Sequence, residues 1–261
     1  VVIKLNLCAL KTPETGITSD PRVVKAFLVY LRERCNNANI TLVESDATTA
    51  RADLFFEWLG FTDLARKYDC EVKNLSDDEL ISVKLDGVHF RKFRFPKTVV
   101  QSDYFISLAK MKTCTLTKIS CCLKNQFGCI PYWRKDVYHS HIDEVIAYVN
   151  KIMPPDFCLV DGVIAHEGTL GPSAGKPKYM GLLVGGKDPV AVDSTCAKIM
   201  GFNPHRIGHI QKAKKLGLGN DVTQVVGENI ENVRSKFRFS SWESFLFNIF
   251  MGMRRQKVEW Q

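Results

Sequence analysis

Four lysines lie close together in a stretch of the chain that contains no acidic residue. The stretch covers residues 107 to 128 and reads SLAKMKTCTLTKISCCLKNQFG, with the lysines Lys110, Lys112, Lys118 and Lys124. A solvated basic surface usually mixes lysine with glutamate and aspartate. Lysines set among small, apolar and thiol side chains therefore predict a pocket that binds an anion.

The same stretch carries thiols that could react with a bound molecule or hold a metal. Nearby lysines lower the pKa of a thiol, which makes Cys114 a candidate nucleophile. The region's cysteines follow the spacing C-x6-C-C-x6-C, with members Cys114, Cys121, Cys122 and Cys129. This spacing has no C-x2-C pair and so departs from zinc-ribbon and ferredoxin patterns. A metal or iron–sulfur cluster on these thiols is the alternative to a reactive Cys114.

Carboxylates and a histidine follow other apolar runs. Asp161 ends the run FCLVD, and a carboxylate at the end of a buried strand favours a functional role. His166 and Glu167 begin the Gly-rich loop that follows, where His166 is a candidate acid or base. Asp188, before Pro189, has the features of a helix N-cap. A second use for these acids is a shared divalent metal, whose expected ligands are Asp161, Asp188 and Asp193.

These observations define two expected sets of site residues. The set expected to act on the substrate is Lys112, Cys114, Asp161, His166 and Glu167. The set expected to hold a cofactor or the anionic group of the substrate is Lys4, Asn6, Lys110, Lys124 and Asn125.

The elements that position these residues follow a βαβ order. Apolar runs predict strands at 1–6, 40–45, 104–109, 157–162 and 179–186. Ser19 or Asp20 followed by Pro21 predicts the start of a helix after the first strand. This order favours an open, mostly parallel, doubly wound sheet with helices on both faces. The strand ends at Lys4, Lys112, Asp161 and Asp188 would then meet at one edge of the sheet.

Other segments complete the predicted α/β fold. Residues 55–70 predict two short helices divided at Gly60, and 116–123 a further helix. The pair Asp86-Gly87 predicts the turn of a small β-hairpin insertion over 80–94. Further helices are expected over 139–153, 189–201 and 205–217, with a short strand near 223–227.

Composition limits the class of protein. The chain has 261 residues and a formal net charge of +8, and no run of about 20 apolar residues that could span a bilayer. Its nine cysteines, an odd number without a signal-like start, predict a reduced, cytoplasmic protein. Nucleic acid is not an expected partner, because the sequence signatures of nucleic-acid modules are absent. The start without methionine suggests a trimmed piece of a longer protein.

The chain is expected to form one α/β domain over residues 1–239 and a helical tail over 240–261. The tail is an apolar helix, Trp242 to Met253, followed by basic residues. Such a segment could contact a protein partner or a membrane surface.

Seven motifs in this order resemble the family catalogued as domain of unknown function 362: VIKLN, SDPRVV, VES, SLAKMKT, LKNQFG, VDGVIAHEGTLGPSAGKP and GGKDPVAVDS. The resemblance covers residue 1 to about 235 and implies the fold and the location of the pocket. Many members of that family carry a ferredoxin-type iron–sulfur module, which the printed sequence does not contain. The family's lysine motif usually has histidine where this chain has Cys114. The resemblance therefore implies either a thiolate ligand at this position or altered chemistry.

Two hypotheses about function follow. The first is an enzyme that acts on a phosphorylated or carboxylated small molecule, with or without a divalent metal. The second is a metal- or iron–sulfur-handling redox accessory protein that uses the clustered thiols.

Overall fold

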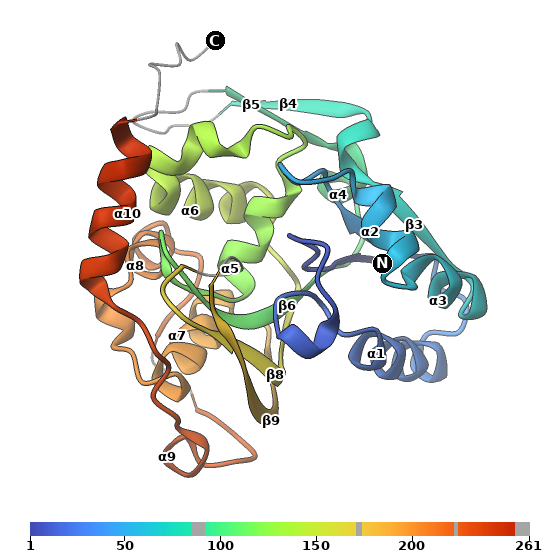
Figure 1. Ribbon diagram of the computed structural model, residues 1–261. Helices are drawn as coiled ribbons and strands as arrows, with labels where there is room; N and C mark the ends of the chain where they lie inside the picture. The colour runs from blue at the N-terminus through green and yellow to red at the C-terminus, as the bar shows by residue number, and fades with distance from the viewer. Residues whose placement is uncertain (85–91, 171–173, 222–223, 254–261) are drawn as a thin grey trace.

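A mostly parallel sheet forms the centre of the protein (Figure 1). The computed structural model describes residues 1–84, 92–170, 174–221 and 224–253. The strands of this sheet are β1 (Val2–Lys4), β2 (Ile40–Glu44), β3 (Cys70–Asn74), β6 (Phe105–Cys114), β7 (Lys118–Ser120), β8 (Phe157–Glu167) and β9 (Lys176–Gly186). Their order is β3-β2-β1-β6-β8-β9, with β7 paired to β6. The chain first builds outward from β1 through β2 to β3 and then returns to the other side of β1. The crevice between β1 and β6 is therefore the topological switch point, where open α/β sheets bind ligands.

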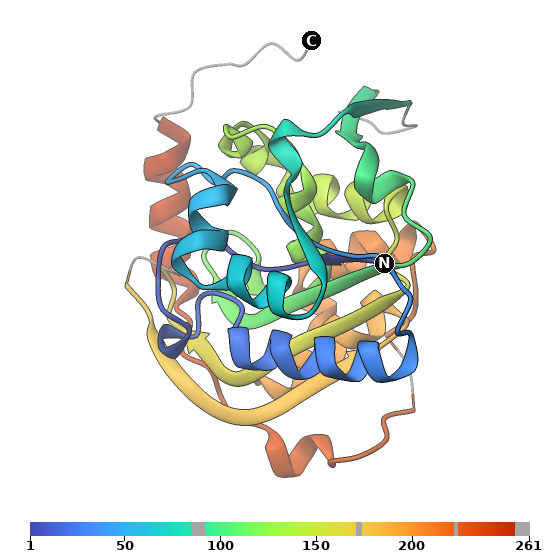
Figure 2. The ribbon, with the colours of Figure 1, turned by 90° about the vertical axis from the view of Figure 1, so that its right-hand side faces the viewer.

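Helices cover both faces of the sheet, as predicted (Figures 1 and 2). One face packs against α1 (Pro21–Arg34), α2 (Ala52–Trp58) and α3 (Phe61–Lys67). The other face packs against α5 (Cys122–Asn125), α6 (Ile142–Ile152), α7 (Pro189–Ile199) and α8 (Gly208–Lys215). Alternate residues of one strand enter opposite cores, since Ile3 lies in the first and Val2 in the second.

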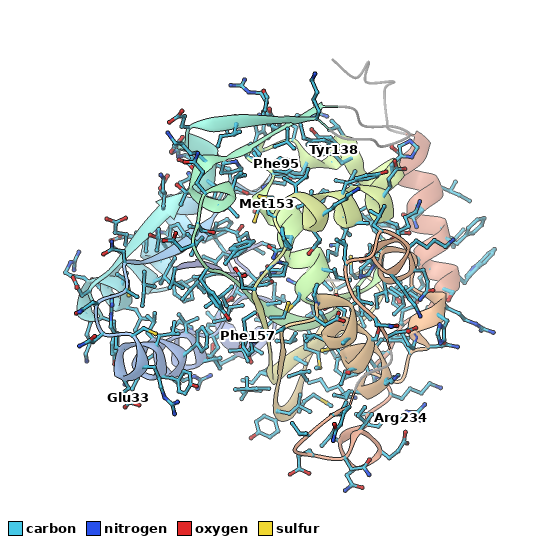
Figure 3. The ribbon with its side chains drawn as sticks, turned by 180° about the vertical axis from the view of Figure 1, so that it is seen from behind. Glu33, Phe95, Tyr138, Met153, Phe157 and Arg234 are labelled. Atoms are coloured by element: carbon cyan, nitrogen blue, oxygen red, sulfur yellow. The ribbon has the colours of Figure 1, made fainter. Side chains whose placement is uncertain are left out.

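The remaining elements lie around this sandwich. They are β4 (Leu80–Lys84), β5 (Lys92–Pro96), α4 (Lys97–Val100), α9 (Ile230–Val233) and α10 (Ser241–Met253). Short 3-10 helices occupy Pro13–Thr15, Leu75–Asp77, Gln126–Cys129, Lys135–His141 and Pro204–Arg206. Strands β4 and β5 form the predicted antiparallel hairpin, whose Asp86-Gly87 turn lies outside the described residues. Figure 3 shows Phe95, Tyr138 and Met153, which belong to the core beside this hairpin.

The predicted helix signals are confirmed where a cap or a break marks them. Asp20 accepts a hydrogen bond from the backbone N–H of Arg22 at 2.8 Å, and Pro21 is the first residue of α1. Gly60 separates α2 from α3 with a φ of 75°, a value that disfavours other residues. Within the described ranges, no helix is both long and apolar enough to cross a bilayer.

Three predictions about local structure are wrong. Residues 116–123 do not form one helix, because Ile119 is buried by the antiparallel pairing of β7 with β6 before α5 begins at Cys122. Strand β6 does not end at Ala109 but continues through the lysines to Cys114. The described part of the strand expected near 223–227, residues 224–227, is not a strand.

The direction of β9 has the largest effect on the site. It runs antiparallel to β8, with Gly186 opposite Cys158 at the start of that strand. The chain therefore enters α7 from the amino end of the parallel strands. Asp188, which follows β9, lies at the opposite edge of the sheet from the end of β6.

Candidate functional site

A cleft of about 330 Å³ lies at the switch point between β1 and β6. Residues from the ends of β1, β2 and β6 line it together with α5 and the segment after it. The lining includes Lys4, Asn6, Cys8, Glu44, Ser45, Lys112, Cys114, Thr115, Lys124, Asn125, Gly128 and Lys135. The cleft thus gathers cations and amides from four separate segments of the chain.

Lys112 projects from the end of β6 and is almost fully buried. Its Nζ donates to Asn6 Oδ1 at 2.6 Å, to Cys8 Sγ at 3.0 Å and to the backbone oxygen of Ile17 at 2.9 Å. None of the three acceptors is a carboxylate. No carboxylate of the described residues forms an ion pair with this ammonium, so it leaves a positive charge in the wall of the cleft.

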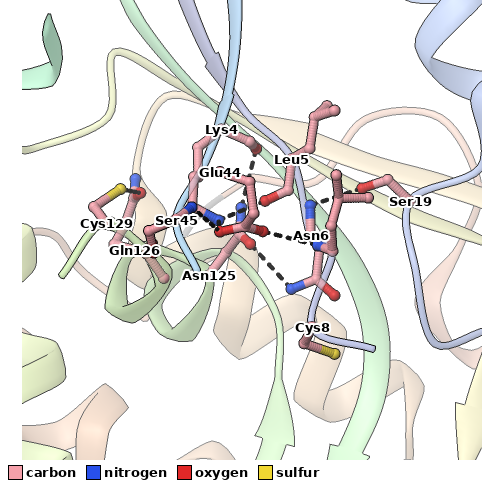
Figure 4. A network of polar contacts seen from close by, with 12 residues as sticks. Lys4, Leu5, Asn6, Cys8, Ser19, Glu44, Ser45, Asn125, Gln126 and Cys129 are labelled. Atoms are coloured by element: carbon pink, nitrogen blue, oxygen red, sulfur yellow. Dashed lines mark hydrogen bonds and ion pairs between the residues drawn. The ribbon is translucent and has the colours of Figure 1, made fainter. Parts of the chain in front are cut away.

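Lys4 and Glu44 form a buried ion pair beside Lys112, with Nζ and Oε1 2.5 Å apart (Figure 4). The other carboxylate oxygen of Glu44 accepts from the backbone N–H of Leu7 at 2.8 Å. Gly128 packs directly on the pair, because a Cβ at this position would lie 2.7 Å from Lys4 Nζ. The charge of Lys4 is therefore balanced within the protein.

Two asparagines connect the strands that meet in the cleft. Asn6 Nδ2 donates to Asn125 Oδ1 at 3.1 Å (Figure 4). Asn125 Nδ2 donates to the backbone oxygen of Lys4 and to Ser107 Oγ, each at 3.1 Å. Both amides are thus held by several bonds, which fixes the wall of the cleft before any ligand arrives.

Cys114 ends β6 at the edge of the cleft and is half-buried. Burial acts to raise the pKa of its thiol. The charge of Lys124 and hydrogen bonds with Thr117, Leu116 and Lys124 outweigh burial, and they lower the pKa from 9.0 to about 7. About half of the thiol is therefore ionised at neutral pH, and the thiolate is the reactive form.

Lys135 is a fourth lysine of the cleft, and no sequence pattern predicted it. It stands in the segment PYWRKD, which has no apolar period and reads as an exposed loop. In the structure the Nζ of Lys135 donates to Ser45 Oγ at 2.6 Å and to the backbone oxygen of Asp46 at 2.5 Å. Burial lowers the pKa of this amine to about 8, although the charge of Glu44 acts in the opposite direction.

Lys110 and Asp161 were expected to line the site, but neither is among the residues that line the cleft. Their Nζ and Oδ2 atoms lie 2.7 Å apart, and both side chains are 0% exposed. Asp161 Oδ1 also accepts from the backbone N–H of Val163 at 3.0 Å. The two charges neutralise each other inside the sheet, between neighbouring strands β6 and β8.

His166 and Glu167 also lie outside the residues that line the cleft. His166 Nδ1 is 2.7 Å from the backbone oxygen of Thr15, and the ring packs against Gly175. Glu167 Oε2 accepts from Lys178 Nζ at 3.2 Å and from the backbone N–H of Arg238 at 3.1 Å. The contact of Glu167 with Arg238 holds the chain that leads into α10.

The three predicted metal ligands are separated by the fold. Asp161 is paired with Lys110, and Asp188 caps α7 by accepting from the N–H groups of Val190 and Ala191. Asp193 accepts from the N–H groups that begin α5, at 2.8 Å from Cys122 and 3.1 Å from Leu123. Across the described ranges, no three His, Cys, Asp or Glu side chains form a group suited to a metal ion.

Asp193 nevertheless supports the cleft indirectly. It is fully buried on α7, and burial raises the pKa of its carboxyl to about 7 despite the two N–H donors. Those donors belong to α5, which carries Lys124 and Asn125 into the cleft. Asp193 is therefore a residue that positions the site.

The clustered thiols are divided in the same way. Cys114 lines the cleft, while Cys121, Cys122 and Cys129 are buried in the core. A hydrogen bond to Cys196 and burial raise the pKa of Cys121 well above 9.0, and burial does the same for Cys122. Burial also raises the pKa of Cys129 to about 12. The three core thiols therefore stay protonated at neutral pH in the metal-free protein.

Comparison with known proteins gives one family and distant relatives. A model of the family described as domain of unknown function (DUF362) matches residues 1–198. The thylakoid-associated protein sll1697 of Synechocystis sp. is 31% identical over 140 residues, which are 51% of this chain and 43% of that protein. The match thus spans less than half the length of that relative. The lactate racemase apoprotein from Thermoanaerobacterium thermosaccharolyticum has a TM-score of 0.42 at 14% identity, over 68% of this chain and 45% of that one. So low a similarity supports no inference about function.

Proposed function

This chain belongs to the family of domain of unknown function 362, a name that assigns no reaction, so we propose its function from the cleft itself. The protein is an enzyme that binds a carboxylated or phosphorylated small molecule at the β1–β6 switch point. Lys112, Lys124 and Lys135 attract its acidic group, and the Cys114 thiolate is the reactive side chain.

The excess of positive charge in the cleft carries this proposal. Lys112, Lys124 and Lys135 line it, and in the described part of the chain none of them forms an ion pair with a carboxylate. Two acids also line the cleft, and each already has a partner: Glu44 is paired with Lys4, and Asp136 with Arg134. Cations held in a partly desolvated cleft lower their free energy by binding an anion. A cleft of about 330 Å³ suits a small metabolite.

The thiol supplies chemistry that a simple binding site would not need. The pKa of Cys114, about 7, lies at the ambient pH. An acid–base or nucleophilic group works best there, because both its protonation states are populated. Cys114 lies in the same cleft as the lysines, so a substrate anchored by its acidic group would lie beside the thiolate.

The redox alternative has less support. It needs several thiols that converge on one site, whereas Cys114 lines the cleft and the other three candidates lie in the core. Metal assistance through Asp161, Asp188 and Asp193 likewise has no common site in the described structure.

A pair of alkylating reagents tests the proposal. Iodoacetate and iodoacetamide react with thiolates by the same displacement of iodide, but only iodoacetate is an anion. The positive cleft should make Cys114 react faster with iodoacetate relative to iodoacetamide than an exposed thiol does. Mass spectrometry of the modified peptides measures both rates at Cys114 and at Cys35, an exposed thiol outside the cleft that serves as the internal control.

Added ligands complete the experiment. Phosphate or a small dicarboxylate should protect Cys114 from both reagents and leave Cys35 unaffected. In Lys112→Gln, the preference of Cys114 for iodoacetate should fall toward that of Cys35. Equal reagent preference at the two thiols of the native protein, together with no protection by any anion, would rule out an anion site.

A further inference from the structure

Helix α10 exposes four large apolar side chains. Trp242, Phe245, Leu246 and Ile249 are between 44% and 66% exposed. They are spaced i, i+3, i+4 and i+7, which places them on one face of the helix. The rings of Trp242 and Phe245 stack with centroids 5.7 Å apart. We call these four residues the α10 stripe.

The face that packs on the body of the protein includes Ser244 and the half-buried Phe247. Ser244 is buried, and its Oγ donates to the backbone oxygen of Thr115 at 2.6 Å. Just before the helix, the backbone N–H of Ser240 donates to Thr169 Oγ1 at 2.8 Å. A surface helix normally buries its apolar face. Helix α10 instead leaves the stripe exposed, and the helix itself lies at one side of the molecule (Figure 1).

The surrounding sequence is basic. Arg234, Lys236 and Arg238 precede the helix, and Arg254, Arg255 and Lys257 follow it, while Glu243 is the only charged residue of the helix itself. Lys236 and Arg238 are exposed, although Arg238 Nε lies 3.4 Å from Glu167. An apolar stripe between two basic segments matches an anionic lipid surface, which offers acyl chains below negative headgroups. A second copy of the chain would instead bring like charges together.

We propose that α10 lies in the plane of an anionic lipid bilayer, with the α10 stripe in the headgroup region and Lys236 and Arg238, which precede the helix, on the lipid phosphates. The helix has 13 residues, which corresponds to about 20 Å. The apolar core of a bilayer is about 30 Å thick, so α10 is suited to lie on it and not to cross it. This inference does not depend on the reaction proposed for the cleft.

Vesicle flotation of the full chain tests this inference. The native protein should float with phosphatidylserine-containing vesicles, float much less with phosphatidylcholine alone, and be released as salt is raised. A double variant, Trp242→Ser with Phe245→Ser, should bind at least about tenfold more weakly, because it removes two aromatic side chains from the lipid contact. The matched control is Trp58→Ser, since Trp58 is 70% exposed on α2, away from the stripe, and should leave binding unchanged.

A second measurement covers the case in which the double variant does not fold. Trp242→Phe keeps the stripe apolar and removes its fluorophore. Brominated lipid should quench native tryptophan fluorescence, and most of that quenching should vanish in Trp242→Phe but persist in Trp58→Ser. Sedimentation without lipid tests whether a second copy of the chain covers the α10 stripe instead.

Four results would overturn the inference. These are no flotation of the native protein, equal binding to neutral vesicles, equal quenching in the two tryptophan variants, or a dimer that only the double variant dissociates. The last result would assign the stripe to a second copy of the chain.

Discussion

Replacing Lys124 with glutamine should change the reactivity of Cys114 in opposite directions at low and high pH. Burial favours the neutral thiol, and the charge of Lys124 is the strongest influence against it, which leaves the pKa of Cys114 at about 7. Without that charge the pKa should return to the ordinary 9.0 or above. At pH 7 the thiolate fraction would then fall from about one half to about 1%, roughly 50-fold.

A second effect opposes the first. A thiolate of higher pKa is a stronger nucleophile, with a Brønsted coefficient of about 0.4 to 0.5, so a rise of about two pKa units makes each thiolate about 6 to 10 times more reactive. The net rate at pH 7 should therefore fall only about 5- to 8-fold. Above pH 10 the Cys114 thiol is almost fully ionised in both the native protein and the variant, so the variant should react about 6 to 10 times faster than the native protein.

Thiol–disulfide exchange with dipyridyl disulfide measures the reaction rate of Cys114 as a function of pH, both near pH 7 and above pH 10. Absorbance follows the reaction, and mass spectrometry assigns it to Cys114. Lys118→Gln is the matched control, because Lys118 lies in the same segment but is not among the groups that shift the pKa of Cys114. If the pH at which the rate of Cys114 is half-maximal stays near 7 in Lys124→Gln, then Lys124 does not set the ionisation of this thiol. If the rate of the variant stays on the same side of the native rate at every pH, the proposed opposition between thiolate fraction and nucleophilicity is refuted.

Two predictions concern residues outside the cleft. Lys110→Met alone should lower the unfolding free energy by about 3 to 5 kcal/mol, because it leaves the buried Asp161 without a partner, whereas Lys110→Met with Asp161→Leu should recover most of that loss. Urea unfolding of the single and double variants measures this, and strictly additive losses would contradict a coupled pair. Burial raises the pKa of Asp193 from 3.8 to about 7, so the folded protein binds this proton more tightly than the unfolded chain. Its contribution should lower the unfolding free energy as pH rises from about 4 to about 7, by a total on the order of 4 kcal/mol. Asp193→Asn should flatten this part of the pH profile, and an unchanged slope would remove Asp193 as its source.

Apolar runs and the polar residues at their ends were sufficient to predict most strands of the sheet and several of the residues that line the cleft. Strands β1, β2, β6 and β8 are short apolar runs whose ends carry polar residues, a pattern typical of buried parallel strands. Once these strands are adjacent, their carboxyl ends must meet. This is why Lys4, Asn6 and Lys112 were correctly expected to lie together.

Longer-range features could not be read from the sequence. Strand β3 is half-exposed and contains Glu71 and Lys73, so it has no apolar run to reveal it. The direction of β9 depends on the path of the chain after β8, and periodicity carries no information about direction. That direction alone decides that Asp188 lies away from the cleft.

Electrostatic partners are equally hidden. Lys110 and Lys112 are two residues apart on one strand, yet Lys110 is neutralised by Asp161 and Lys112 is not. Lys135 reaches the cleft only because the chain after Gly128 returns over the end of β2, where Ser45 accepts its hydrogen bond. Neither outcome follows from residue type or spacing.

The ammonium of Lys112 has three N–H groups, and all three are already used. An anion that approaches it must therefore displace one acceptor. The sulfur of Cys8 is the weakest of the three, and it belongs to the only exposed residue among them. Cys8 thus occupies the place that a ligand oxygen would take, and exchange of sulfur for oxygen would leave the other two bonds of Lys112 intact. The thiol of Cys8 would then lose its contact with the ammonium whenever the cleft is filled, so its reactivity would report occupancy in the unmodified protein.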